Sequence, residues 1–137
     1  MKLSTRSRYG TRMVLNLAEN YNEGPIQIGQ IAKHLDVSVK YLEQLIIPLK
    51  KADLIKSVRG PKGGHKLAKP PAEVTVGEIV RILEGGIDLS DCISDPEVCQ
   101  NTESCAARSV WQEATDAMYG KLNSITFANM IEKGKIV

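Results

Sequence analysis

All three cysteines of this 137-residue chain lie in one acidic stretch, DCISDPEVCQNTESC, which covers residues 91–105. Cys92 and Cys99 are separated by six residues, and Cys99 and Cys105 by five. An odd number of thiols cannot all pair, and the N-terminal residues MKLSTR contain no apolar stretch that could act as a secretion signal. We therefore expect a cytoplasmic protein with reduced thiols, in which clustered cysteines indicate metal binding or redox sensing.

The spacing of these cysteines leaves three kinds of site open. Structural zinc sites usually contain closely spaced pairs of cysteines, and this stretch contains no such pair. Iron–sulfur clusters accept wider spacings and use a histidine or carboxylate when a fourth cysteine is missing. Cys105 lies at the start of a predicted helix, whose partial positive charge favours a thiolate. The pattern favours an iron–sulfur cluster, with zinc binding and a metal-free thiol sensor or inert cysteines as the alternatives.

A cysteine-dependent enzyme is the rival class of function. It would need a histidine base, and the only histidines are His34 and His65, both in the N-terminal half. No motif orients either imidazole toward a thiol. We therefore predict that the protein is not an enzyme.

The two halves of the chain differ in charge, although the net charge is only +2. Residues 1–70 contain 13 Lys and Arg against 5 Asp and Glu, whereas residues 71–137 contain 5 against 11. The basic half therefore suits a polyanion such as double-stranded DNA. No apolar run approaches the ~20 residues needed to cross a bilayer, so we expect no membrane partner.

Two helices joined by a tight turn are predicted in the basic half. Apolar residues recur at helical spacing over residues 28–35 and 38–49, after a first helix over about residues 4–20. Any small helical bundle contains such a pair, but Ser38 is also placed to cap the second helix, as in a helix-turn-helix. Pro48 predicts a kink in this helix or a restart beyond it. The DNA-contacting residues of this recognition helix would be Ser38, Lys40, Tyr41, Glu43 and Gln44.

A basic hairpin is predicted directly after the recognition helix. Residues 55–58 and 65–67 have the pattern of short strands, and the tip RGPKGG between them carries Arg59 and Lys62. The tip lacks the sequence of a nucleotide-binding loop, and no helix opens after it. A helix-turn-helix followed by a basic hairpin is a winged helix. Its recognition helix would enter a major groove, while Arg59 or Lys62 would meet the backbone or the minor groove.

The acidic half is predicted to hold the cysteines between two helices, at residues 76–83 and about 105–123. The second helix is long for so small a domain, and its face of small and apolar residues predicts a dimer seam. We therefore expect a mainly α fold: a winged helix-turn-helix with a small two-stranded β wing and a long C-terminal dimerisation helix. Residues 1–72 would form the DNA-binding region, and residues 73–137 the cluster-binding loop and the dimerisation helices. A homodimer also suits palindromic promoter DNA.

Several motifs together resemble the IscR-type winged-helix transcription regulators, which carry an iron–sulfur cluster. They cover almost the whole chain: MKLSTRSRYG, VSVKYLEQLI, SVRGPKGGHKLAK, the three cysteines and LNSIT. The resemblance implies a homodimer that binds promoter DNA in response to a [2Fe–2S] cluster held by Cys92, Cys99 and Cys105, and that controls iron–sulfur cluster biogenesis. It also implies that Glu43 discriminates between classes of DNA site. The alternative function, found in the wider group, is a sensor of redox state, nitric oxide or thiols that binds zinc or no metal.

One residue departs from the pattern of this family. Similar regulators place a histidine three residues after the last cysteine, where this chain has Arg108, which stays protonated and offers no lone pair to iron. Other relatives take a ligand from the N-terminal helix of the partner subunit, but this chain has Arg8 and Arg12 at those positions. The fourth ligand is therefore open. The candidates are Glu103, Asp91 and Asp95 in the loop, and His34 and His65 at a distance.

Overall fold

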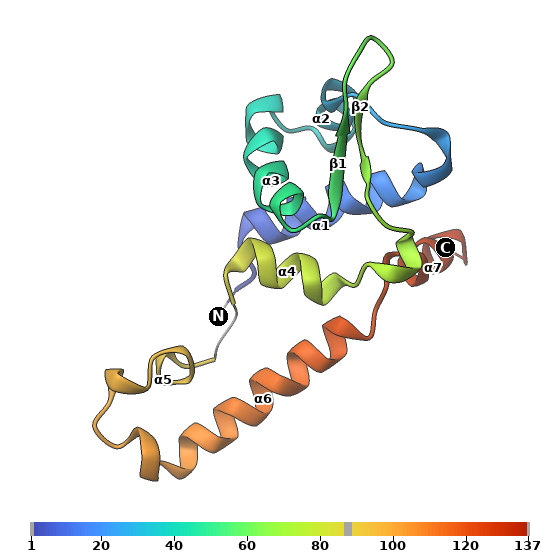
Figure 1. The fold of residues 1–137 in the computed structure, drawn as a ribbon. Helices are drawn as coiled ribbons and strands as arrows, with labels where there is room; N and C mark the ends of the chain where they lie inside the picture. The colour runs from blue at the N-terminus through green and yellow to red at the C-terminus, as the bar shows by residue number, and fades with distance from the viewer. Residues whose placement is uncertain (1, 87–88, 137) are drawn as a thin grey trace.

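The computed structural model describes residues 2–86 and 89–136 (Figure 1). Its α-helices are α1 (Thr5–Glu19), α2 (Ile28–Leu35), α3 (Val39–Lys51), α4 (Val76–Glu84), α5 (Asp91–Ser94), α6 (Ala106–Asn123) and α7 (Phe127–Ile136). The same residues form the strands β1 (Ile55–Val58) and β2 (Gly64–Leu67) and the 3-10 helices η1 (Tyr21–Glu23), η2 (Pro71–Glu73), η3 (Pro96–Val98) and η4 (Thr102–Ser104). None of the described helices is long and apolar enough to cross a membrane.

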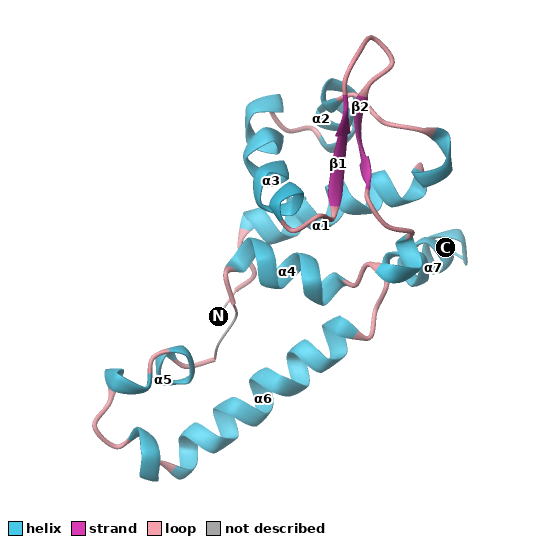
Figure 2. Ribbon diagram, in the orientation of Figure 1, coloured by secondary structure: helices cyan, strands magenta, loops and turns pink. Residues whose placement is uncertain are grey.

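The described residues form two parts, which we call the head and the arm. The head comprises residues 2–86 and 119–136, and the arm comprises residues 89–118. Figure 2 shows a largely helical head with one hairpin, and the long helix α6 extending away from it. The predicted mainly α architecture with a two-stranded wing is therefore confirmed.

The turn between α2 and α3 depends on two residues. Asp36 ends α2 in the left-handed conformation, with φ 56° and ψ 51°. Ser38 then caps α3, because its hydroxyl accepts a hydrogen bond of 3.1 Å from the backbone N–H of Tyr41. The predicted pair of helices and the predicted cap are both present.

The helix α3 continues to Lys51 without a break, although Pro48 lies inside it. Of the two predicted effects of Pro48, the restart of the helix is therefore wrong, and the kink stays a prediction. The proline removes one backbone hydrogen bond. However, Leu45, Ile46 and Leu49 on either side of it are buried in the same core, and this burial keeps the helix continuous.

The wing is an antiparallel hairpin whose register pairs Ile55 with Leu67 and Val58 with Gly64. A bridge between Ile26 and His65, with both N···O distances at 2.8 Å, fastens β2 to the segment before α2. Glycine is required at position 64 because a side chain there would collide with the Ile26 backbone. The hairpin is therefore held in a defined position beside the helix-turn-helix.

One hydrophobic core joins the N-terminal and C-terminal parts of the head. Met13 and Leu17 of α1 belong to it, together with Leu83 of α4 and Phe127 of α7. Leu83 packs so close to Gly10 that any side chain at position 10 would collide with it. The helices α4 and α7, which follow the wing, are therefore part of the same folded unit as α1.

The sequence patterns above do not predict α7. At its N-terminus, Thr126 Oγ1 accepts a hydrogen bond from the Asn129 N–H, and Asn129 Oδ1 accepts one from the Thr126 N–H. This reciprocal capping corresponds to a T-x-x-N spacing in the sequence, which is the signal that could have located the helix.

The arm projects because α6 packs on the head only near its C-terminal end. There the Arg81 guanidinium lies 4.0 Å from the centre of the Tyr119 ring, and Gly77 allows Asn123 to approach its backbone. Earlier in the helix, Val110 and Trp111 are 54% and 44% exposed. Figure 1 shows α5 and the cysteine loop beside the far end of α6.

Candidate nucleic-acid interface and cysteine loop

The face of α3 opposite the core carries Lys40, Gln44 and Ile47, all exposed. They recur three or four positions apart, so they form one row along the helix. Ile47 is 54% exposed and was missed by the sequence reasoning. The sequence pattern that could have identified Ile47 is its position one turn after Glu43 and Gln44. An apolar side chain there can contact a thymine methyl group.

Glu43 lies on the edge of α3 that faces the wing. The charges of both Glu43 and Lys50 act on the imidazole of His65 in β2. Burial lowers the pKa of His65 most, Lys50 lowers that pKa further, and the Glu43 carboxylate opposes the change. The imidazole Nδ1 also shares a hydrogen bond of 3.0 Å with Ser57 Oγ across the hairpin. Glu43 therefore lies where the two predicted DNA-binding elements meet.

Tyr41 lies on the opposite edge of α3. Its ring meets the ring of Tyr9 in α1 edge to face, with centroids 6.1 Å apart and an angle of 88° between the planes. Its hydroxyl is buried and has no hydrogen-bond partner among the described residues. Tyr41 was expected to contact DNA together with Lys40. In the structure its ring lies against Tyr9 of α1 instead. Successive helical residues point about 100° apart, so Tyr41 is turned away from Lys40 and toward α1.

Arg59 and Lys62 lie in the tip of the wing, and both are exposed. Figure 1 shows the tip extending past the helix-turn-helix. Ser38 is also exposed, although its hydroxyl already caps α3. Contact of these three residues with DNA stays a prediction.

The three cysteines lie in the arm, and none of them is in a disulfide. Cys92 is half-buried in α5, with its Sγ 3.2 Å from Ser90 Oγ. Cys99 and Cys105 are exposed, and Cys105 occupies the N-cap position of α6. The Nε of Arg108 donates a hydrogen bond of 3.1 Å to the Cys92 carbonyl. Arg108 therefore ties α5 to α6 through the backbone of a candidate ligand.

The thiol donors of the loop suit an iron–sulfur cluster, but they do not converge. Within residues 2–86 and 89–136, no three His, Cys, Asp or Glu side chains are grouped so that they could hold a metal ion. Asp91, Asp95 and Glu103 are exposed in the same loop, whereas His34 and His65 belong to α2 and β2. The loop would have to close around a cluster, and the fourth ligand is not identified by these positions.

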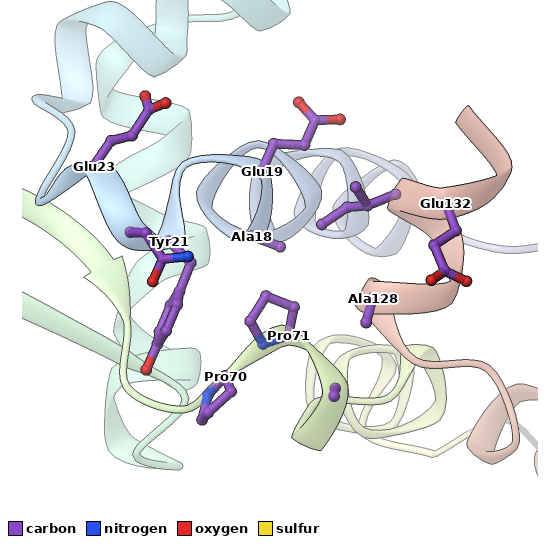
Figure 3. A pocket seen from close by; sticks show the side chains of 11 residues that line it. Ala18, Glu19, Tyr21, Glu23, Pro70, Pro71, Ala128 and Glu132 are labelled. Atoms are coloured by element: carbon purple, nitrogen blue, oxygen red, sulfur yellow. The ribbon is translucent and has the colours of Figure 1, made fainter. Parts of the chain in front are cut away.

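A cavity of about 610 Å³ lies at the C-terminal end of α1, against η1, η2 and α7 (Figure 3). Its walls include Tyr21, Pro71 and three acidic residues, Glu19, Glu23 and Glu132. The carboxylates make this end of the head unsuitable for a polyanion. The candidate DNA-binding surface is therefore the one formed by α3 and the wing.

A family model described as "Rrf2: Iron-dependent Transcriptional regulator" matches residues 3–133. The chain belongs to the Rrf2 family. Its relatives in this family include the protein rrf2 of Nitratidesulfovibrio vulgaris, which is 42% identical over 136 residues that cover 99% of this chain and 91% of that protein. This chain is therefore an Rrf2-family transcriptional regulator, and the resemblance to IscR-type regulators is confirmed.

Two solved structures of similar proteins match this Rrf2-family chain over nearly its whole length. IscR of T. potens has a TM-score of 0.80 and 36% identity, over 98% of this chain and 88% of that chain. CymR, the global cysteine regulator of B. subtilis, has a TM-score of 0.81 and 36% identity, over 97% of this chain and 98% of that chain. The winged-helix fold is confirmed, but an IscR and a cysteine regulator share it, so fold alone does not identify the signal.

Proposed function

We propose that this Rrf2-family regulator acts in the cytoplasm as a homodimer on promoter DNA. Its binding would respond to an iron–sulfur cluster, a [2Fe–2S] cluster, held by Cys92, Cys99 and Cys105. The genes under its control would be those of iron–sulfur cluster biogenesis. The observation that carries the proposal is the spacing of three cysteines within residues 92–105, the last of which is the N-cap of α6. Similarity to an IscR supports it.

In this proposal α3 and the wing supply the DNA contacts. Lys40 and Gln44 face the base edges of a major groove, and Arg59 and Lys62 reach the backbone or the minor groove. Glu43 can accept a hydrogen bond from cytosine, whereas phosphates and the guanine acceptors repel its carboxylate. Glu43 therefore acts as a filter against the wrong sites.

Two copies would meet along α6. Val110 and Trp111 are large, apolar and exposed on this helix. A second copy would cover them and set the two recognition helices about one turn of DNA apart, ~34 Å. The homodimer thus matches a promoter with two half-sites.

Hydrogen bonds connect the entrance of the cysteine loop to the DNA-binding half. Glu84 ends α4 shortly before the loop, and its Oε1 accepts hydrogen bonds from Ser4 N at 2.8 Å, Ser4 Oγ at 2.5 Å and Ser7 Oγ at 2.6 Å. At the other side of the entrance, the Leu89 N–H donates to Thr115 Oγ1 of α6 at 3.3 Å. A displacement of the loop would therefore act on the N-terminus of α1, which packs against α3.

A metal-free thiol sensor is the second candidate function. Two observations favour it: the described side chains form no metal-binding group, and the fold is equally similar to that of a cysteine regulator. In this case the exposed thiols of Cys99 and Cys105 would react directly with the signal.

Purification without oxygen, followed by a visible absorption spectrum and assays of iron and sulfide, separates the two candidates. The cluster predicts a coloured protein, and replacement of Cys92, Cys99 or Cys105 by alanine should abolish the colour. A folded dimer should remain, because the loop lies outside the core. An undiminished spectrum in all three variants would remove the cluster assignment. A colourless protein whose DNA binding changes on thiol oxidation would instead establish the second candidate.

A further inference from the structure

The cavity at the C-terminal end of α1 has an apolar floor and an acidic rim (Figure 3). Its volume of about 610 Å³ lies within the range of small-molecule sites, which is about 300–1,000 Å³. The floor is formed by buried or half-buried side chains: Ala18, Tyr21, Pro71, Ala128 and Ile131. The rim carries exposed carboxylates: Glu19, Glu23 and Glu132. A ligand that suits both must combine an apolar body with positive charge.

The three carboxylates of the rim lie on two walls of the cavity. Glu19 and Glu23 belong to the end of α1 and to η1, whereas Glu132 belongs to α7. Figure 3 shows Glu23 and Glu132 on opposite sides of Ala18 and Pro71. Of the described residues that line the cavity, none is Lys or Arg, and no ion pair neutralises the three carboxylates. A cleft lined by charges of one sign attracts ligands of the opposite sign.

The walls of the cavity are held in place by the core of the head. The Phe127 N–H at the start of α7 donates a hydrogen bond of 3.0 Å to the Val74 carbonyl, directly after η2. Both of these residues are fully buried. Pro70 and Pro71 restrict the backbone of η2 further, because each ring fixes φ. A preformed site loses little conformational entropy when a ligand binds.

We propose that this cavity binds a linear aliphatic diamine, with its methylene chain on the apolar floor and one ammonium group at each wall of the rim. One ammonium meets Glu19 and Glu23, and the other meets Glu132. A metal ion would leave the apolar floor uncovered, and a monoamine would leave one wall without a cation. The residues of this site belong neither to the cysteine loop nor to α3 and the wing, so the inference does not depend on the function proposed above.

The test is isothermal titration calorimetry of the chain without DNA, at neutral pH, where aliphatic amines are charged, and near 0.1 M salt. The probes are linear diamines from propanediamine to hexanediamine. One ligand should bind per protomer, and one chain length should bind best, because the two walls have a fixed separation. Butylamine, which has a single ammonium, should bind about fivefold more weakly than the best diamine. Mg²⁺ should not displace the diamine.

Three variants locate the site. Glu132→Gln should weaken binding of the best diamine about fivefold and remove its advantage over butylamine, because one ammonium loses its carboxylate. Ala128→Leu should prevent binding, because the larger side chain fills the floor of the cavity. Glu73→Gln is the matched control, since Glu73 is an exposed acid of η2 outside the cavity lining, and it should leave the affinity unchanged.

Four outcomes would overturn the inference. The first is that no diamine binds at concentrations up to about 10 mM. The second is that Mg²⁺ or butylamine binds as tightly as the best diamine. An equal loss of affinity in Glu132→Gln and Glu73→Gln would show that diamines only respond to the general charge of this end of the head. Undiminished binding to Ala128→Leu would place the diamine elsewhere. If Ala128→Leu does not fold, the comparison of Glu132→Gln with Glu73→Gln decides.

Discussion

The head and the arm differ in what buries their apolar side chains. In the head, apolar residues of α1, α2, α3, α4, α7 and both strands pack into one core, and Tyr119 of α6 packs with Val80 in a small second cluster. In the arm, four large apolar residues are between 40% and 56% exposed: Leu89, Val98, Val110 and Trp111. The head is therefore a self-sufficient scaffold, whereas the arm presents apolar surface that a second copy of the chain can cover.

The two parts also differ in charge. Residues 89–118 contain six Asp and Glu and one basic residue, Arg108. The region of α1 to β2 is strongly basic, with an excess of Lys and Arg over residues 1–70. Repulsion from phosphates keeps the arm away from DNA. This contrast supports the proposal that the head binds DNA and that the arm is used for dimerisation and for its thiols.

The largest expected effect is the loss of stability on mutation of a residue in the core of the head. Phe127 is fully buried, so Phe127→Ala should lower the free energy of unfolding by about 3–5 kcal/mol. Urea denaturation followed by circular dichroism measures this. Val98→Ala in the arm, where the side chain is 56% exposed, should change it by about 0.5 kcal/mol or less. If both variants lost a similar free energy of unfolding, the head and the arm would not differ in how they bury apolar side chains.

The next effect concerns the exposed apolar face of the arm. Trp111→Ala should raise the dissociation constant of the dimer by about 30-fold or more, because a buried tryptophan at an interface contributes about 2 kcal/mol or more. Sedimentation equilibrium measures the constant. Asp116→Ala, on another face of α6, should leave it unchanged. A Trp111→Ala protein that dimerises as tightly as wild type would show that α6 is not the seam.

A smaller effect is expected where α4 meets α1. Hydrogen bonds from the side chains of Ser4 and Ser7 lower the pKa of Glu84, with help from the Ser4 N–H and the charge of Arg6. A lowered pKa in the folded state means that the ionised carboxylate stabilises the fold above the usual range for glutamate. This contribution is lost as the pH falls through the pKa of Glu84 in the folded protein.

Glu84→Gln should therefore lower the free energy of unfolding by about 1 kcal/mol at neutral pH. On acidification, the variant should lose less stability than the wild type. Urea denaturation at a series of pH values measures both. Glu113→Gln, an exposed substitution in the arm, is the matched control. Parallel pH profiles for wild type and Glu84→Gln would mean that the contact does not couple α4 to α1.

The smallest effect on affinity is expected at Glu43. Glu43→Ala removes a repulsive group, so protein without a cluster should bind a broader set of promoters with little loss at its preferred one. Selection from random DNA with wild type and variant measures this. An unchanged sequence preference, or a uniform loss of affinity, would show that Glu43 is not a filter.

Local patterns in the sequence were sufficient to predict most of the helices and strands. The helical spacing and Ser38 located α2 and α3, and the strand predicted at residues 55–58 coincides with β1. The long helix expected over about residues 105–123 is α6 (Ala106–Asn123). These predictions succeed because periodicity, capping and turn residues act over a few positions. The same local signals located the cysteine loop between two helices.

By itself, then, the sequence determined the winged-helix order, the charge contrast and the grouping of three thiols in one loop. Tertiary structure decided that α3 runs through Pro48, that Tyr41 turns toward Tyr9, and that the thiols do not converge. It also joined Glu84 to Ser4, 80 positions earlier in the chain. The spacing of apolar residues indicates which residues share a face of a helix or strand. Which other segment that face contacts depends on packing between segments that are distant in the sequence.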